Sequence, residues 1–154
     1  MAAFVSNPLT VTLQAPAEPF VRADLEFHGV DHARASFEAR LFINNPGAGP
    51  DTPTTDESYA GSFWIFGHGG CAGDDGHCAP PRERRPFDFR PDHQLIPVSK
   101  RVMITQKLGA LVRPGEQFTV RVVPWIRPES AERLPANLVT DVLRFDRAVL
   151  ITYQ

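Results

Sequence analysis

Alternation of apolar and polar residues in several short segments is the feature that most constrains the fold of this chain. In the segment 20–27 every second residue is apolar, and the polar positions between them carry Arg22, Asp24 and Glu26. The segments 36–43 and 118–122 repeat the pattern. A period of two is that of a β-strand with one face on a core and the other toward water. The pattern therefore predicts half-buried strands, as in an antiparallel sheet.

The remaining segments extend this reading to the whole chain. Residues 9–13 form a further short strand, and residues 62–66 are apolar almost throughout, which suits a central strand covered on both faces. A last strand at 143–153 is interrupted at Asp146 and Arg147, where we expect a bulge or an exposed edge. Fifteen prolines and eleven glycines separate these runs, and the best helical pattern is the short segment 105–111. We predict an all-β fold, an antiparallel β-sandwich of about seven strands with at most short helices.

Length and charge narrow the classes of protein to consider. The 154 residues suit a single domain, 1–154, and contain neither an internal repeat nor a dividing linker. A net charge of -2 gives no support for nucleic-acid binding. The N-terminus shows no secretory signal and no apolar run reaches the length of a membrane helix. The location stays open between the cytoplasm, which we favour, and that of a larger precursor from which the chain is excised. Two long loops, at about 44–58 and 67–85, are of the kind that carries function or stays mobile.

The glycine-rich segment after residue 66 holds the only concentration of reactive side chains. One interpretation is a copper or zinc site, because imidazole and thiolate bind these metals. Its four ligands would be His68, Cys71, His77 and Cys78. Their spacing matches no common zinc-finger pattern, and adjacent ligands at 77 and 78 are geometrically awkward. The second interpretation, which we favour, is a structural loop in which Cys71 and Cys78 are close enough to form a disulfide.

Other reactive side chains have simpler interpretations. The carboxylate pair Asp24 and Glu26 is expected on a solvated strand face, and His28 and His32 are expected to be surface or hydrogen-bonded residues. Ser62 lacks the second glycine and the strand-to-helix context of a nucleophile elbow. The two tryptophans, at 64 and 125, are expected in the core. The sequence thus predicts no catalytic residue.

Short motifs carry a resemblance to a known family. A Leu-Glu-Phe-His-Gly-Val strand at 25–30 is followed by an Ala-Gly-Ser-Phe-Trp-Ile-Phe-Gly strand at 60–67, and an apolar strand at 118–123 and a Leu-Pro pair at 134–135 come later. This order resembles the C-terminal β-sandwich of molluscan haemocyanin and of tyrosinase-type, or type-3 copper, proteins. The resemblance covers about residues 20–153. The six-histidine helical domain of the family is absent, and the family's acidic turn is replaced by the His/Cys segment.

The resemblance implies a function as well as a fold. In the family the sandwich lies over the entrance of a dicopper site and directs an apolar side chain toward it; by motif position that residue is Phe66, with His68 beside it. The implied function is a non-catalytic module that docks on or shields a tyrosinase-like copper oxidase, as a helper chain or as a domain of a larger oxidase. The isolated chain would hold no cofactor and oxidise no phenol. The plainer expectation, which we favour, buries Phe66 in the core.

A second functional hypothesis needs no partner. In it the chain is an independent protein that binds copper or zinc through the turn containing His68, Cys71, His77 and Cys78. Metal content after purification distinguishes the two hypotheses, as does a search of the neighbouring reading frames for a tyrosinase-like partner. The sequence leaves the oligomeric state open.

Overall fold

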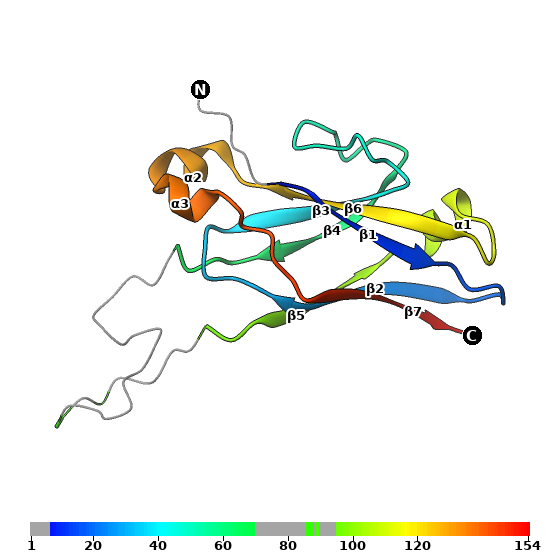
Figure 1. Cartoon of the computed structure of the whole chain (residues 1–154), viewed down its shortest axis with the longest axis horizontal. Helices are drawn as coiled ribbons and strands as arrows, with labels where there is room; N and C mark the ends of the chain where they lie inside the picture. The colour runs from blue at the N-terminus through cyan, green and yellow to red at the C-terminus, as the bar shows by residue number, and fades with distance from the viewer. Residues whose placement is uncertain (1–6, 70–85, 88, 90–94) are drawn as a thin grey trace.

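The chain folds as a two-layer β-sandwich, as a computed structural model that describes residues 7–69, 86–87, 89 and 95–154 shows (Figure 1). One sheet has four strands, in the order β1 (Leu9–Gln14), β6 (Gln117–Trp125), β3 (Phe37–Ile43) and β4 (Tyr59–Ile65). The other has three, in the order β5 (Val98–Met103), β2 (Arg22–Val30) and β7 (Arg147–Tyr153). Every paired strand is antiparallel. The predicted seven-stranded antiparallel sandwich is confirmed.

In the described part of the chain, three short helices lie at the two ends of the sandwich. Helix α1 (Thr105–Leu111) lies at one end, and α2 (Pro128–Arg133) and α3 (Ala136–Val139) lie together at the other (Figure 1). The bounds of α1 are those predicted, and its Leu108 is buried in the core. Among the residues with assigned structure, no helix is both long and apolar enough to cross a membrane.

The core lies between the two sheets. It is formed by the side chains at the apolar positions of the alternating pattern. On β2, Ala23, Leu25 and Phe27 are fully buried. The ring of Phe27 lies 4.9 Å, centroid to centroid, from that of Phe63 on β4. Because β2 and β4 belong to different sheets, this contact joins the two layers, as expected of interdigitating inner faces.

Two strand predictions need correction. Strand β4 is an edge strand, since β3 is its partner and it ends the order of its sheet. Its apolar residues occupy both faces for different reasons: Phe63 and Ile65 are in the core, while Trp64 is 39% exposed on the outer face. Trp64 is therefore outside the core, contrary to our expectation.

The last strand is shorter than predicted. Strand β7 begins at Arg147, and the preceding Asp146 donates its backbone N–H to the carbonyl of His28 at 2.9 Å. Val142 and Leu143 are buried but lie outside the strand. The polar Asp146-Arg147 pair thus marks the start of the strand and not a break within it. Of the two expectations for this segment, the edge agrees with the structure, since β7 ends the order of its sheet.

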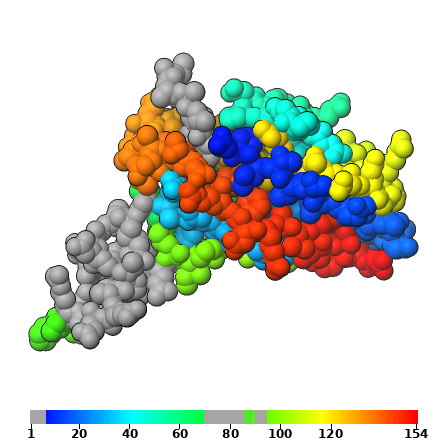
Figure 2. All heavy atoms as spheres, in the orientation of Figure 1, coloured from blue at the N-terminus to red at the C-terminus, as the bar shows by residue number. Residues whose placement is uncertain are grey.

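The loop 44–58 covers part of the outer face of the larger sheet, where Figure 2 shows it in cyan to green. Ala48 of the loop packs with Phe42 of β3 and Val123 of β6 in a second small apolar cluster. Arg121 Nε donates to the Ala48 carbonyl at 2.6 Å, and Asn45 Nδ2 donates to Ser58 Oγ at 3.0 Å. These contacts give the loop a structural role in covering the sheet.

Candidate docking site at the Phe66 end of the sandwich

Phe66 directly follows β4 and its side chain is 80% exposed. The expectation that it belongs to the core is wrong. Successive side chains of a strand point to opposite faces, and Phe63 and Ile65 occupy the inner one. Trp64 and Phe66 therefore share the outer face, so that an aromatic pair lies at the end of an edge strand.

Backbone hydrogen bonds fix the chain on both sides of Phe66. Before it, Ile65 pairs with Phe37 in the β3–β4 register. After it, the Gly67 N–H donates to Ser36 Oγ at 2.9 Å, and the Gly69 N–H donates to the Arg34 carbonyl at 3.0 Å. The exposed ring of Phe66 is thus carried by an anchored backbone.

Gly67 makes this anchoring possible. A Cβ atom at position 67 would lie 2.0 Å from the Arg34 carbonyl oxygen and 2.5 Å from the Ala35 carbonyl carbon. Both are backbone atoms, which cannot move aside as a flexible side chain could. Close approach of two backbones is a common reason for glycine at such a position. The glycine after the strand therefore serves packing.

A groove of about 500 Å³ runs beside Phe66. Among the described residues its lining comprises aromatic, apolar and small hydroxyl side chains and the guanidinium of Arg127: Ser36, Trp64, Ile65, Phe66, Arg127 and Ser130. The guanidinium carbon of Arg127 lies 5.8 Å from the centroid of the Trp64 ring. Aromatic residues and arginine are enriched at protein interfaces, where aspartate and glutamate are depleted.

His68 follows Gly67 in the turn after β4 and contacts a histidine that our sequence analysis treated separately. Its ring centroid is 4.9 Å from that of His32, and its backbone N–H donates to the His32 carbonyl at 3.0 Å. His32 in turn has its Nε2 atom 2.7 Å from the carbonyl oxygen of Ile96. The prediction that His32 is hydrogen-bonded is confirmed. Its pairing with His68 had no local signal, because 35 residues separate them.

Three of the four proposed metal ligands, Cys71, His77 and Cys78, lie outside the described residues. The metal site and the disulfide therefore stay predictions. Within the part of the chain that the structure describes, no group of three or more histidine, cysteine, aspartate and glutamate residues could hold a metal ion.

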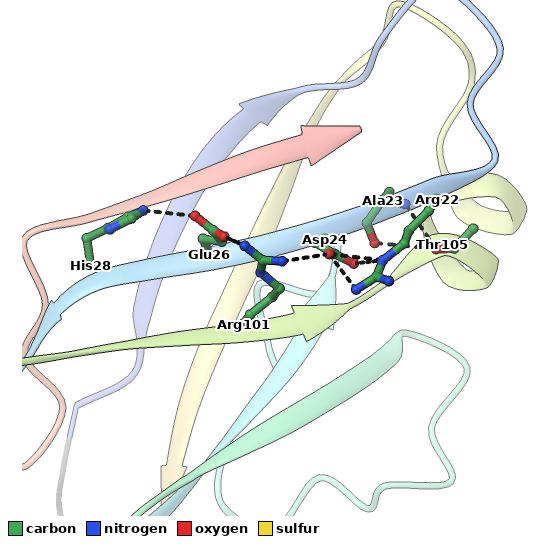
Figure 3. Close-up of polar contacts among 7 residues, drawn as sticks. All are labelled: Arg22, Ala23, Asp24, Glu26, His28, Arg101 and Thr105. Carbon is green, nitrogen blue, oxygen red and sulfur yellow. Dashed lines mark hydrogen bonds and ion pairs between the residues drawn. The ribbon is translucent and has the colours of Figure 1, made fainter. Parts of the chain in front are cut away.

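The carboxylate pair on β2 differs from the sequence prediction. Asp24 is fully buried although it lies on the outer face, because Arg22 and Arg101 fold over it (Figure 3). Arg22 Nε donates to its two oxygens at 2.8 and 3.0 Å. This hydrogen bonding, with the charges of both arginines, holds the pKa of Asp24 below its usual value despite the opposing effect of burial. The prediction of a solvated pair is wrong for Asp24.

The same network extends along β2. Arg101 also pairs with Glu26, and His28 Nε2 lies 3.2 Å from the other oxygen of Glu26 (Figure 3). The Thr105 hydroxyl accepts the Ala23 N–H at 3.0 Å and so joins α1 to β2. Each carboxylate has a cationic partner, and the arrangement is a structural clamp across β2 and β5.

Ser62 likewise belongs to a structural network. Its hydroxyl donates to Glu38 at 2.7 Å, and Glu38 also accepts from Arg40 Nε at 2.9 Å. Arg40 stacks on the ring of Trp125 at 4.4 Å. The partner of the Ser62 hydroxyl is a carboxylate held by arginine and not an imidazole base, which agrees with its predicted lack of a nucleophilic role.

Comparisons with known proteins bear on the fold. No protein-family model and no curated protein matches the chain. Solved structures of aurone synthase, a polyphenol oxidase, are similar to it. The latent enzyme from its natural source has a TM-score of 0.54 at 14% identity, covering 95% of this chain and 24% of that one. The recombinant latent enzyme has a TM-score of 0.53 at 15% identity, covering 97% and 25%.

The chain therefore spans about a quarter of the length of the polyphenol oxidase chains that it resembles. At this level of identity the similarity concerns the fold alone. It supports the tyrosinase-type part of the resemblance found in the sequence. This β-sandwich has the fold of one region of a tyrosinase-type polyphenol oxidase.

Proposed function

We propose that this chain is a non-catalytic module that docks on a tyrosinase-like type-3 copper oxidase and shields the entrance of its dicopper site. The observation that carries the proposal is the exposed ring of Phe66 on an anchored backbone. An interface residue whose backbone is already fixed loses less conformational entropy on binding, and aromatic side chains are common among binding hot spots.

The surroundings of Phe66 support a protein partner. Trp64 lies on the same outer face, and Ile96, whose carbonyl faces His32, is 65% exposed. Scattered exposed apolar residues are ordinary on protein surfaces, whereas several at one end of a sandwich are typical of an interaction surface. The groove beside Phe66 would accept a partner side chain, and Arg127 would pair with a carboxylate or carbonyl at its rim.

The neighbouring structures suggest which partner to test. They are structures of a latent polyphenol oxidase, and covering the entrance of an active site is one physical way to keep an oxidase latent. The region that shares this fold makes up about a quarter of the length of such an oxidase chain. The same arrangement fits either a helper chain or a domain of a larger oxidase.

Mixing this chain with a tyrosinase-like oxidase encoded in a neighbouring reading frame tests the proposal. Binding by interferometry and catechol oxidation are measured for the wild type and for Phe66→Ala. We expect a 1:1 complex that inhibits oxidation, and a loss of affinity of about 2 kcal/mol or more, some thirtyfold, in the variant.

Met103→Ala is the matched control, since Met103 is 63% exposed but lies next to α1 at the opposite end. It should leave binding and inhibition unchanged. Equal loss in both variants, or inhibition that survives Phe66→Ala at unchanged affinity, would contradict docking through Phe66.

A further inference from the structure

The groove beside Phe66 combines aromatic rings, a guanidinium and hydroxyl groups, a set of side chains that suits a sugar chain. We propose that this groove binds an oligosaccharide that carries carboxylates, of the uronic acid class. Its volume of about 500 Å³ lies within the range of about 300–1,000 Å³ that is typical of ligand pockets. The inference goes beyond docking and does not depend on it, because it concerns the free chain, in which no partner fills the groove.

Two aromatic rings line the groove from the same face of β4. Trp64 and Phe66 are both exposed, and side chains two positions apart along a strand lie about 7 Å apart. The face of an aromatic ring carries partial negative charge, whereas one face of a pyranose ring presents C–H groups with partial positive charge. Two rings at this spacing can therefore contact neighbouring sugar residues of one chain.

The polar groups of the groove match the remaining groups of such a ligand. The guanidinium carbon of Arg127 lies 5.8 Å from the centroid of Trp64, and within the described part of the chain this guanidinium has no carboxylate partner. It is therefore available for a bidentate contact with a ligand carboxylate. Ser36 Oγ accepts the Gly67 N–H, which leaves its own proton for a sugar hydroxyl, and Ser130 adds a second hydroxyl to the lining.

A fixed polar network lies next to Trp64 on the sheet. Glu38 is directly opposite Trp64 on one side and Trp125 on the other, so that the three form one row across β4, β3 and β6. The Glu38 side chain is only 10% exposed and accepts hydrogen bonds from Ser62 at 2.7 Å and from Arg40 at 2.9 Å. Arg40 in turn stacks on Trp125. Because the surroundings of Trp64 are fixed before binding, less conformational entropy is lost when a ligand binds.

Calorimetric titration of the full chain with a galacturonic acid trimer tests the proposal without any oxidase, so that its failure is distinct from a failure of docking. We expect one trimer per chain, and an affinity lower by about tenfold or more in Trp64→Ala and in Arg127→Gln. The fully methyl-esterified trimer has the same sugar rings without the charges and should bind more weakly by a similar factor. Arg113→Gln is the matched control and should bind like the wild type, since Arg113 is an exposed arginine just after α1, at the opposite end of the sandwich.

NMR of the wild type keeps the test decisive should Trp64→Ala fold poorly. The trimer should shift the indole N–H signal of Trp64 and leave the amide signal of Met103, at the opposite end, unchanged. Trimer affinity that is unaltered by Arg127→Gln in a folded variant would overturn the proposal, as would the absence of binding at millimolar trimer. Equal affinity for the esterified trimer would also overturn it, and so would benzoate that binds more tightly than the trimer, since the groove would then select small aromatic acids.

Discussion

Phe63 and Phe66 lie three residues apart but differ in their exposure to solvent. Phe63 is 5% exposed and contacts Phe27 of the other sheet, whereas Phe66 is 80% exposed beside the groove. Composition does not separate them, because both are phenylalanines in one apolar run. The alternation of side-chain directions along the chain distinguishes them, since Phe63 points inward and Phe66 points outward. An apolar run on an edge strand can therefore serve the core and an interaction surface together.

The two positions also differ in what holds them. Packing between the sheets holds Phe63, while hydrogen bonds from the flanking backbone hold Phe66. A loss of side-chain volume on the core side of β4 should thus lower the stability strongly. On the outer side, changes in the turn should affect how Phe66 is held. We expect substitutions on the core side to lower stability most, changes at the buried carboxylate Asp24 to come next, and changes around Phe66 to have the smallest effect.

Phe63→Ala should have the largest effect. Loss of a buried phenylalanine leaves a cavity and costs about 3–5 kcal/mol. For a chain of this size that corresponds to a fall in melting temperature of roughly 10 °C. Differential scanning calorimetry measures it, and a fall of only a degree or two would show that the two faces of β4 are less distinct than we infer.

Asp24→Asn should come next. The substitution removes the charge that Arg22 and Arg101 surround, and we expect a loss of about 1–2 kcal/mol, moderated because both arginines are half-exposed to water. Urea unfolding at neutral pH measures it. The double variant with Arg22→Gln should lose less than the sum of the two single changes, because the residues share one contact. Strict additivity would contradict the clamp.

The same carboxylate predicts a pH dependence of stability. The pKa of Asp24 is lower in the folded chain than its ordinary value of 3.8, so the ionised form favours folding. Its contribution is fully present above that value and is lost as the pH falls below it, through the folded pKa. The difference in unfolding free energy between wild type and Asp24→Asn should therefore shrink below about pH 4. Urea unfolding at a series of pH values measures it, and a difference that stays constant down to pH 2 would contradict this assignment.

Changes around Phe66 should have the smallest effects on stability. Ser36→Ala removes the acceptor of the Gly67 N–H and should cost about 0.5–1 kcal/mol, because water can replace the exposed hydroxyl. Hydrogen exchange at the Gly67 amide should become faster. Phe66→Ala should change stability by less than about 0.5 kcal/mol while weakening partner binding. A melting temperature lowered as far as in Phe63→Ala would remove the distinction between the two positions.

Local pattern was sufficient for much of the fold. The alternation in 20–27 and 36–43 predicted which residues of β2 and β3 enter the core, and the bounds of α1 were correct. Pattern was insufficient where a residue's neighbours come from distant segments. Asp24 occupies a position that the alternation predicts to be solvated, yet Arg101 from β5 helps to bury it. That contact depends on the β2–β5 register, which a single segment does not encode.

The class of fold, the approximate number of strands and the inward-facing residues of the core could be predicted from sequence, because they follow from periodicity within single segments. The folded chain was needed to show that β4 is an edge strand, that Phe66 is exposed and that His32 contacts His68. Each of these depends on which strands become neighbours and on where Gly67 lets two backbones approach. Pairing order and backbone contact are properties of the assembled sheets, and for that reason the candidate site emerged only with them.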